Sequence, residues 1–356
     1  MRIGILTYHF STKNYGAILQ TYASFQLLKK LNYEPRVINL LPGKKQKFIS
    51  KFKHVFKQYL FNNNPFNDFI KKHLHLTKPF YSDDKLTNLN SEFDTFYVGS
   101  DQVWRASMSQ ERLIHYFLDF ADEEKVKISY AASFGISNWE GDSEITEQIK
   151  PLIRRFNAIG VRENDGINIC KHTFNVDATQ VLDPTLLLDE NDYLKLLKRS
   201  NKFKGPDYIA YYLIQDREAN GDLWKEIDEK STYKVVNLFG EIKSLLGKKY
   251  LKFNSIEHWL IGMIDASFIV TDSFHCVIFS IIFRKNFICI PNQHGGISRI
   301  NNLLSMLGLE DRLYNSKNYN LNYYISKPIN YFSVYEKLSL YKQKSLEFLT
   351  RSINSI

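Results

Sequence analysis

The chain has 356 residues and a formal net charge of +9, and 44% of its residues are hydrophobic, 15% aromatic and 24% charged. That apolar content is enough for a core and excludes a mainly disordered chain. The three cysteines, Cys170, Cys276 and Cys289, form no C-x-x-C pair, which excludes a zinc ribbon and a disulfide framework.

The first residues, Met1 to Leu6, are followed closely by Tyr8, His9 and Lys13, so they form no signal-peptide core. No apolar run approaches the roughly 18 residues that a membrane-spanning helix needs. We therefore expect a cytoplasmic protein, with peripheral attachment to the inner face of the cell membrane as an alternative.

Positive charge is concentrated in an acid-free stretch between Glu34 and Asp68, which holds six closely spaced lysines. Aromatic residues recur at helical spacing there, and this predicts a basic amphipathic helix over residues 44–60. The helix either packs its aromatic face on the protein or contacts an anionic membrane surface. The charge has no nucleic-acid motif in support, so we expect no nucleic-acid partner.

Short apolar runs alternate with amphipathic stretches along the whole chain, a pattern typical of β-α units around a parallel sheet. Strands are predicted at residues 2–7, 36–40, 95–99, 127–132, 158–162, 180–182, 208–214, 234–238, 267–271 and 286–290. Helices are clearest at residues 15–31 and 331–352. We predict an α/β protein of two Rossmann-like, doubly wound domains facing a cleft, over 1–188 and 189–330, followed by a C-terminal helix over 331–356. Length supports two domains at roughly 150 residues each.

Ligands bind such sheets at the carboxyl ends of the strands. The loop after the first strand reaches a helix N-terminus through Asn14 and Gly16, which favours an anion, although a plain turn is equally compatible. After the third strand, Asp101, Gln102 and Trp104 offer hydrogen bonds and a stacking surface to a sugar. Helix capping by Ser100 or Asp101 is the alternative.

Three further residues follow predicted strands. Arg162 is suited to bind a carboxylate or phosphate, with an internal ion pair to Glu163 or Asp165 as the alternative. His275, in the first turn of a predicted helix, is suited to proton transfer or phosphate binding, and Arg299 is expected close to the same cleft. His73 and His75 have no third ligand nearby, so no metal site is predicted.

Taken together, these segments resemble the polysaccharide pyruvyl transferase family. The matching segments, in chain order, are Gly4-Ile5-Leu6-Thr7-Tyr8, Asn14-Tyr15-Gly16-Ala17, Gln20, Gly99-Ser100-Asp101-Gln102-Val103-Trp104, Ser129-Tyr130-Ala131-Ala132-Ser133-Phe134-Gly135, Val161-Arg162-Glu163, Val181-Leu182-Asp183-Pro184-Thr185-Leu186-Leu187, Thr271-Asp272-Ser273-Phe274-His275 and Ser298-Arg299-Ile300. The chain departs from the family at Ser273, where many members carry an arginine.

The resemblance implies a GT-B-like fold with the acceptor on the N-terminal domain and the donor on the C-terminal one. It also implies transfer of the enolpyruvyl group of phosphoenolpyruvate to two hydroxyls of a sugar, which forms a cyclic ketal in bacterial surface polysaccharide biosynthesis. Phosphoenolpyruvate would be a co-substrate without any cofactor, and the acceptor a lipid-linked oligosaccharide. A nucleotide-sugar glycosyltransferase of GT-B shape and a non-catalytic sugar-binding protein of the same pathway are the alternatives.

The expected roles follow from this chemistry. His275, Arg162 and Asp101 are the predicted catalytic residues, with His275 acting either as general acid or as phosphate partner. The residues expected to bind the donor are Arg162, His275, Arg299, Ser273, Asn14 and Gly16. Those expected to bind the acceptor are Tyr8, Asp101, Gln102 and Trp104.

Overall fold

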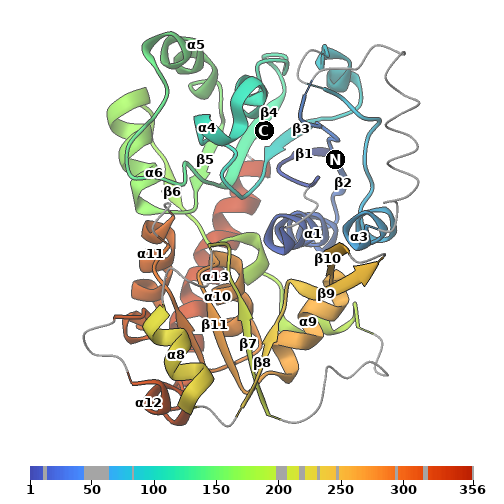
Figure 1. The fold of residues 1–356 in the computed structure, drawn as a ribbon. Coiled ribbons are helices and arrows are strands. Elements are labelled where there is room, and N and C mark those ends of the chain that lie inside the picture. The colour runs from blue at the N-terminus through green and yellow to red at the C-terminus, as the bar shows by residue number, and fades with distance from the viewer. Residues whose placement is uncertain are drawn as a thin grey trace. The chain divides into compact units, whose positions relative to one another are not determined.

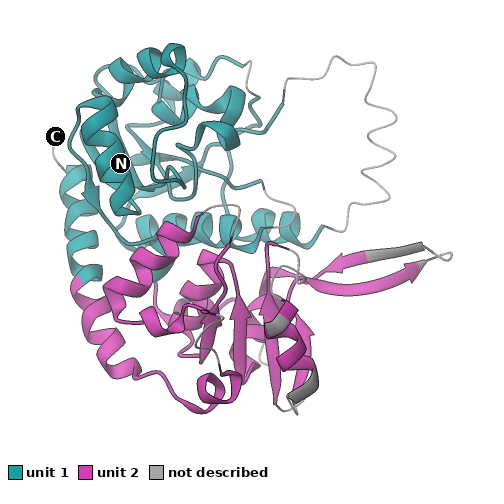
Figure 2. Cartoon of the chain, turned by 60° about the vertical axis from the view of Figure 1, so that its left-hand side comes forward, with its two compact units in different colours: residues 1–187, 341–356 teal, residues 188–340 magenta. Residues whose placement is uncertain are grey.

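A computed structural model describes residues 1–10, 14–43, 64–81, 84–197, 207–215, 221–230, 233–245, 248–292, 296–315 and 320–354. The predicted basic helix at residues 44–60 lies outside these ranges. The chain divides into two compact units, unit 1 from Met1–Leu187 with Tyr341–Ile356, and unit 2 from Leu188–Leu340 (Figure 2).

Unit 1 contains a parallel sheet of six strands in the order β2-β1-β3-β4-β5-β6 (Figure 1). Its strands are β1 (Arg2–Leu6), β2 (Glu34–Val37), β3 (Thr95–Val98), β4 (Val126–Ala132), β5 (Ala158–Val161) and β6 (Thr179–Gln180). Its helices are α1 (Tyr15–Lys30), α3 (Pro65–His73), α4 (Ala106–Ser109), α5 (Ser143–Ile153) and α6 (Asn164–Ile169). Every residue of β3 and β4 is buried, as expected for parallel strands covered on both faces.

Unit 2 contains a second parallel sheet, in the order β12-β11-β7-β8. Its strands are β7 (Tyr208–Tyr212), β8 (Lys234–Asn237), β11 (Phe268–Thr271) and β12 (Phe287–Cys289), and the antiparallel hairpin is β9 (Gly240–Leu245) with β10 (Lys248–Phe253). Its helices are α7 (Glu190–Leu194), α8 (Gly221–Lys230), α9 (Ile256–Asp265), α10 (Phe274–Ile282), α11 (Ile297–Leu307) and α12 (Leu321–Ser326).

The order of each sheet sets where a ligand can bind. In unit 1 the chain runs from β1 outward to β2 and then returns to β3 on the other side of β1. In unit 2 it likewise runs from β7 to β8 and returns to β11. The order therefore reverses between β1 and β3 and between β7 and β11. Doubly wound sheets bind ligands outside the carboxyl ends of the strands at such a reversal.

The last helix, α13 (Tyr331–Asn354), begins in unit 2 and ends in unit 1. In unit 2 the hydroxyl of Tyr335 donates to the carbonyl of Ile282 at 3.0 Å. In unit 1 the backbone N–H of Leu182 donates to the hydroxyl of Ser345 at 3.0 Å. The structure therefore divides this helix, which the sequence predicts as a separate element, between the two units.

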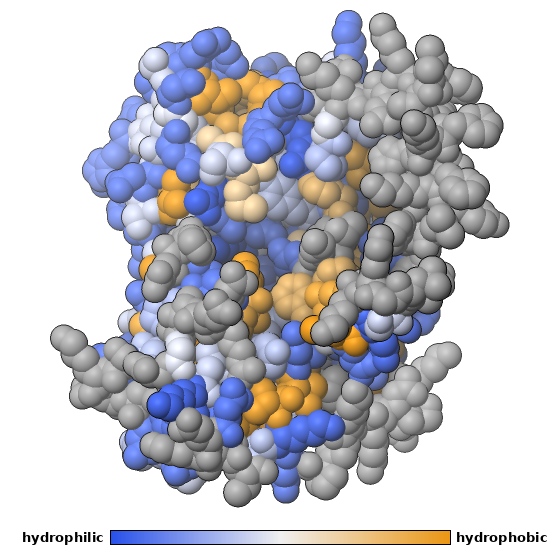
Figure 3. Space-filling model, viewed as in Figure 1, coloured by the Kyte–Doolittle hydropathy of each residue, from blue (hydrophilic) through white to orange (hydrophobic). Residues whose placement is uncertain are grey.

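Each strand predicted from the sequence is present with bounds within three residues, and the α/β class with two doubly wound domains is confirmed. The cleft between the domains remains a prediction. Hydrophobic residues form small separate patches among hydrophilic ones on the face drawn in Figure 3. Within the described ranges, no helix is both long and apolar enough to cross a membrane.

Candidate functional site

In unit 1, hydrogen bonds join the loops that follow β1 and β3. The Thr7 hydroxyl donates to the Ser100 carbonyl at 2.6 Å, and the amide of Gln20 in α1 donates to the Thr7 hydroxyl at 3.0 Å. The hydroxyls of Tyr8 and Ser109 lie 2.5 Å apart, and Ser109 itself donates to the Val103 carbonyl. These bonds hold the two loops together at the reversal point between β1 and β3, at the carboxyl end of the sheet.

Arg162, at the end of β5, is enclosed by carboxylates and is 4% exposed. Its Nη1 donates to Asp183 at 3.1 Å and to the Ser100 hydroxyl at 3.2 Å, while Asp101 and Glu163 lie 3.9 and 3.8 Å from its other nitrogen atoms. Three carboxylates therefore surround this buried guanidinium. The closest is Asp183, and of the two partners expected from the sequence only Glu163 lies near it. The binding of an anionic donor by Arg162 stays a prediction.

Asp101 and Gln102 lie at the carboxyl end of β3. Asp101 adopts a left-handed backbone conformation with φ of 83°, and its carboxylate accepts from the Gln102 N–H at 2.9 Å. The Gln102 side chain accepts from Arg105 at 3.0 Å and lies against Gly135, where an added Cβ would meet Gln102 Oε1 at 2.1 Å. Both side chains are thus held in place at the reversal point, and their contact with a sugar remains a prediction.

Neither predicted stacking residue presents an open ring. Trp104 is fully buried, stacks on Phe117 at 5.0 Å and donates its indole N–H to the Tyr116 carbonyl at 2.9 Å. Tyr8 is 8% exposed, with the Arg112 guanidinium 5.5 Å from its ring centre. The loop after β3 folds back over both rings, and their stacking on a sugar stays a prediction.

The predicted anion loop before α1 is described only from Asn14 onward. The Asn14 side chain accepts from the Ala17 N–H at 3.2 Å and so caps the helix, and Gly16 is buried in the first turn. Both residues therefore start α1, as the alternative of a plain turn expects. Their contact with a donor remains a prediction.

In unit 2, Asp272 joins the loops that follow β7 and β11. Its carboxylate accepts from the backbone N–H groups of Ile214 at 2.6 Å and Gln215 at 2.9 Å. Burial raises the pKa of Asp272 above its ordinary value, and these two hydrogen bonds oppose part of that rise. The side-chain amide of Gln215 donates in turn to the Pro291 carbonyl at 3.2 Å, so three loops meet at this edge.

His275 and Arg299 both contact the ring of Phe274. His275 is 6% exposed, with its ring centre 5.4 Å from that of Phe274, and the Arg299 guanidinium lies 5.7 Å from the same centre. His275 occupies the first turn of α10, and Arg299 the first turn of α11. The structure thus brings an imidazole and a guanidinium to two helix N-termini, where the helix dipole favours an anion.

Ser273 is the N-cap residue of α10, immediately before Phe274, but its side chain makes no capping hydrogen bond. Its backbone N–H donates to the Thr271 hydroxyl at 3.0 Å. The predicted residues Ser273, His275 and Arg299 therefore share one edge of the unit 2 sheet. Across the described residues, no group of three or more His, Cys, Asp or Glu side chains is arranged to hold a metal ion.

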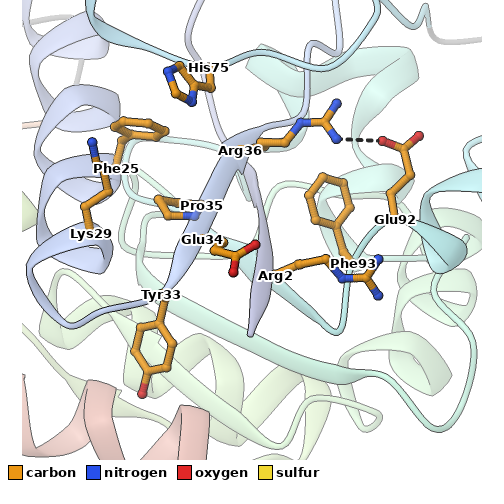
Figure 4. Close-up of a pocket in the computed structure, with 10 residues that line it drawn as sticks. All are labelled: Arg2, Phe25, Lys29, Tyr33, Glu34, Pro35, Arg36, His75, Glu92 and Phe93. Atoms are coloured by element: carbon orange, nitrogen blue, oxygen red, sulfur yellow. Dashed lines mark hydrogen bonds and ion pairs between the residues drawn. The ribbon is translucent and has the colours of Figure 1, made fainter.

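A cavity of about 430 Å³ lies in unit 1 at the amino ends of β1 and β2, away from the reversal point (Figure 4). It has charged walls whose arginines are paired, Arg36 with Glu92 at 3.0 Å and Arg2 with Asp94 at 2.6 Å. Because this is the opposite end of the strands, the cavity is separate from the predicted site.

Several residues that build these two sites have no role predicted from the sequence. Asp183 and Asp272 stand beside predicted residues in the chain, and their position after strands is a signal that points to them. Arg112 has no such signal, since Gln110-Glu111-Arg112 looks like an ordinary exposed polar segment. Its location against Tyr8 depends on how the loop after β3 folds.

Comparison with known proteins gives a family and a fold. The family model described as polysaccharide pyruvyl transferase matches residues 14–294. No curated protein matches the chain.

Among solved structures, a putative UDP-N-acetylglucosamine 2-epimerase from Listeria monocytogenes is similar with a TM-score of 0.53 at 9% identity, covering 100% of this chain and 97% of that one. The UDP-GlcNAc 2-epimerase from Methanocaldococcus jannaschii has a TM-score of 0.48 at 12% identity, covering 95% and 92%. The first likeness extends over the whole chain and shows a shared fold.

Proposed function

The chain belongs to the polysaccharide pyruvyl transferase family, and we propose that it transfers the enolpyruvyl group of phosphoenolpyruvate to two hydroxyls of a sugar. The observation that carries this proposal is the group of His275 and Arg299 around Phe274 at the first turns of α10 and α11. Phosphoenolpyruvate carries a phosphate and a carboxylate, and cationic side chains at helix N-termini suit both.

The proposed reaction starts with protonation of the methylene carbon of phosphoenolpyruvate, with His275 as the general acid. This leaves an oxocarbenium-like centre at the adjacent carbon, and one sugar hydroxyl attacks it and loses its proton. The bond from that carbon to the phosphate oxygen then breaks and phosphate leaves. The second hydroxyl attacks the same carbon, loses its proton and closes the ketal.

Arg299 would balance the charge of the donor and of the departing phosphate. In the alternative assignment, His275 holds the phosphate and another group supplies the proton. On the unit 1 edge, Asp101 and Gln102 would orient the sugar, which we propose to be part of a lipid-linked oligosaccharide.

The test of this function is incubation of the protein with phosphoenolpyruvate and a panel of free and lipid-linked glycosides. We expect release of phosphate in step with a pyruvate-sized mass gain on one glycoside. Stabilisation of the protein by a nucleoside diphosphate, with none by phosphoenolpyruvate, would instead indicate a glycosyltransferase. Stabilisation by neither would indicate a protein without this activity.

The His275→Ala substitution tests the role of the imidazole. Removal of a group that transfers a proton typically lowers the rate by about 10²–10⁴-fold, so we expect a fall of this size in kcat. His258→Ala is the matched control, because His258 belongs to a different helix of unit 2, α9. Near-normal turnover by His275→Ala would rule out the proposed assignment.

A further inference from the structure

Arg112 is a buried arginine at the β1–β3 reversal point of unit 1. It ends the 3₁₀ turn Gln110–Arg112 in the connection between β3 and β4, and it is 8% exposed. Its guanidinium carbon lies 4.8 Å from the ring centre of Phe10 and 5.5 Å from that of Tyr8. Its Nη1 donates to the hydroxyl of Tyr116 at 3.4 Å. Two aromatic rings and one hydroxyl therefore hold this guanidinium.

Two neighbouring cations at this end of the sheet are paired with carboxylates, whereas Arg112 has no such pair among the described residues. Arg162 is paired with Asp183 at 3.1 Å, and Arg105 lies 3.8 Å from Glu140. Within the described ranges, by contrast, no carboxylate oxygen lies within 4.0 Å of the Arg112 nitrogen atoms.

His9, which also faces this cation, supplies no negative charge. Its Nδ1–H donates to the Thr7 carbonyl at 3.2 Å, and its Nε2 lies 2.8 Å from Asn39 Oδ1. Burial, together with the charge of Arg112, lowers its pKa below the ordinary value, so the ring stays neutral at physiological pH. Among the described residues, no directly paired carboxylate therefore compensates the positive charge of Arg112.

A buried cation without a counter-ion is unfavourable, and contacts with aromatic faces offset only part of that cost. An anionic ligand would offset the rest. The two rings also restrict the plane of the guanidinium, so its remaining N–H groups are oriented in advance for the two oxygen atoms of a carboxylate or phosphate.

The predicted sugar-orienting residue Asp101 lies at the same place. Burial raises the pKa of Tyr8 to about 12, and the charges of Arg112 and Asp101 act on that hydroxyl with opposite signs. Asp101 is itself 3.9 Å from Arg162 and accepts from the Gln102 N–H. Among the described cations at this end of the sheet, Arg112 is therefore available for an anion brought in by a substrate.

We propose that Arg112 binds a carboxylate or phosphate group of a substrate at the β1–β3 reversal point. This inference rests on the proposed function and adds a recognition residue to it. The anionic group has two possible sources, phosphoenolpyruvate or an acidic acceptor such as a uronic acid or a carrier diphosphate. Both sources present the same oxygen geometry to the guanidinium.

The test compares the Arg112→Gln variant with wild type and with Arg36→Gln. The control removes the same charge from the same unit at the opposite end of the sheet, in the cavity of Figure 4. Calorimetry gives the affinity for phosphoenolpyruvate and for inorganic pyrophosphate, and kinetics give KM for the acceptor. In Arg112→Gln we expect either one of the two affinities to fall or the acceptor KM to rise, by about 30-fold or more. In Arg36→Gln we expect all three quantities to change little.

The quantity that changes identifies the source of the anion. A lower affinity for phosphoenolpyruvate indicates the donor, whereas a lower affinity for pyrophosphate or a higher acceptor KM indicates the acceptor. Arg112→Lys keeps the charge but loses the planar guanidinium, so its affinity should fall between that of wild type and that of Arg112→Gln. If Arg112→Gln does not fold, Arg112→Lys takes its place in the comparison. A lower Tm with unchanged affinities would overturn the proposal, as would absence of binding by the wild type. Binding without product would reject the proposed function while leaving the affinity comparison valid.

Discussion

At the scale of single residues, Gly296 controls where Arg299 lies. Gly296 precedes α11 with φ of 86°, a left-handed conformation that other residues adopt only at a cost. A Cβ added there would meet Arg299 Nη2 at 2.3 Å. The guanidinium therefore occupies the space that a side chain at position 296 would fill.

We expect Gly296→Ala to displace Arg299 and to weaken phosphoenolpyruvate binding about tenfold, together with a loss of about 1–2 kcal/mol in unfolding free energy from the backbone conformation. Gly221→Ala is the matched control, because among the described residues a Cβ at Gly221 meets nothing within 4 Å. Calorimetric titration with phosphoenolpyruvate measures the first effect, and unchanged affinity in Gly296→Ala would contradict the role given to Arg299.

The sequence predicts where the backbone of a site residue lies, but not what its side chain contacts. A residue that follows a strand has a known backbone position, which is why Asp101, Arg162 and His275 were found at the carboxyl edges. What its side chain meets depends on segments distant in sequence. Trp104 is covered by Tyr116 and Phe117, and Arg162 is paired with Asp183, and neither contact has a signature in the local sequence.

At the scale of elements, Arg162, Asp183 and Ser100 join the ends of β5, its neighbour β6, and β3, which is separated from β5 by β4 in the sheet. Arg162 follows β5, Asp183 follows β6, and the hydroxyl of Ser100, which follows β3, donates to Asp183 at 2.7 Å. The other oxygen of Asp183 accepts from the backbone N–H of Thr185 at 3.0 Å and from its hydroxyl. These hydrogen bonds therefore hold the segments that follow β3, β5 and β6 together at the carboxyl end of the unit 1 sheet.

Asp183→Asn would leave the Arg162 guanidinium without its closest carboxylate. Loss of one partner from a buried ion pair typically costs about 3–5 kcal/mol, and we expect the unfolding free energy of unit 1 to fall by the lower part of that range, since Asp101 and Glu163 remain nearby.

Glu92→Gln serves as the control, because it breaks the exposed Arg36–Glu92 pair and should cost at most about 1 kcal/mol. Urea unfolding followed by circular dichroism measures both variants. Equal stability of the two would show that the buried pair contributes no more than the exposed one.

The strands were predictable because each parallel strand is a short, uninterrupted apolar run. The β9–β10 hairpin was missed for the opposite reason. Ile242 and Leu251 pair across it and are 74% and 39% exposed, so this pair of apolar residues does not mark a buried face with a period of two in the sequence. Figure 2 shows it extending away from the rest of unit 2.

At the scale of the whole molecule, every cysteine is buried and both units contain at least one. Cys170 belongs to unit 1, and Cys276 and Cys289 belong to unit 2. Burial raises the pKa of the thiols of Cys170 and Cys276 to about 12 and that of Cys289 well above its ordinary value. The thiolate, which is the reactive form, is therefore nearly absent in the folded protein at neutral pH.

We expect the native protein to react negligibly with a soluble thiol reagent at pH 8 and to expose all three thiols in denaturant. Labelling at intermediate denaturant, followed by peptide mass spectrometry, reports which unit opens first. Modification of any of the three cysteines in the native protein, at the rate of a free thiol, would contradict their burial.

The passage of α13 from unit 2 into unit 1 bears on the order in which the protein forms during synthesis. Domains generally fold from the N-terminus as the chain emerges. Here unit 2 has all its residues once Leu340 has left the ribosome, whereas unit 1 still lacks residues 341–356. Ser345, which bonds Leu182, and Phe348, which lies against Gly160, belong to that last segment. The unit that is translated first is thus the one that is finished last.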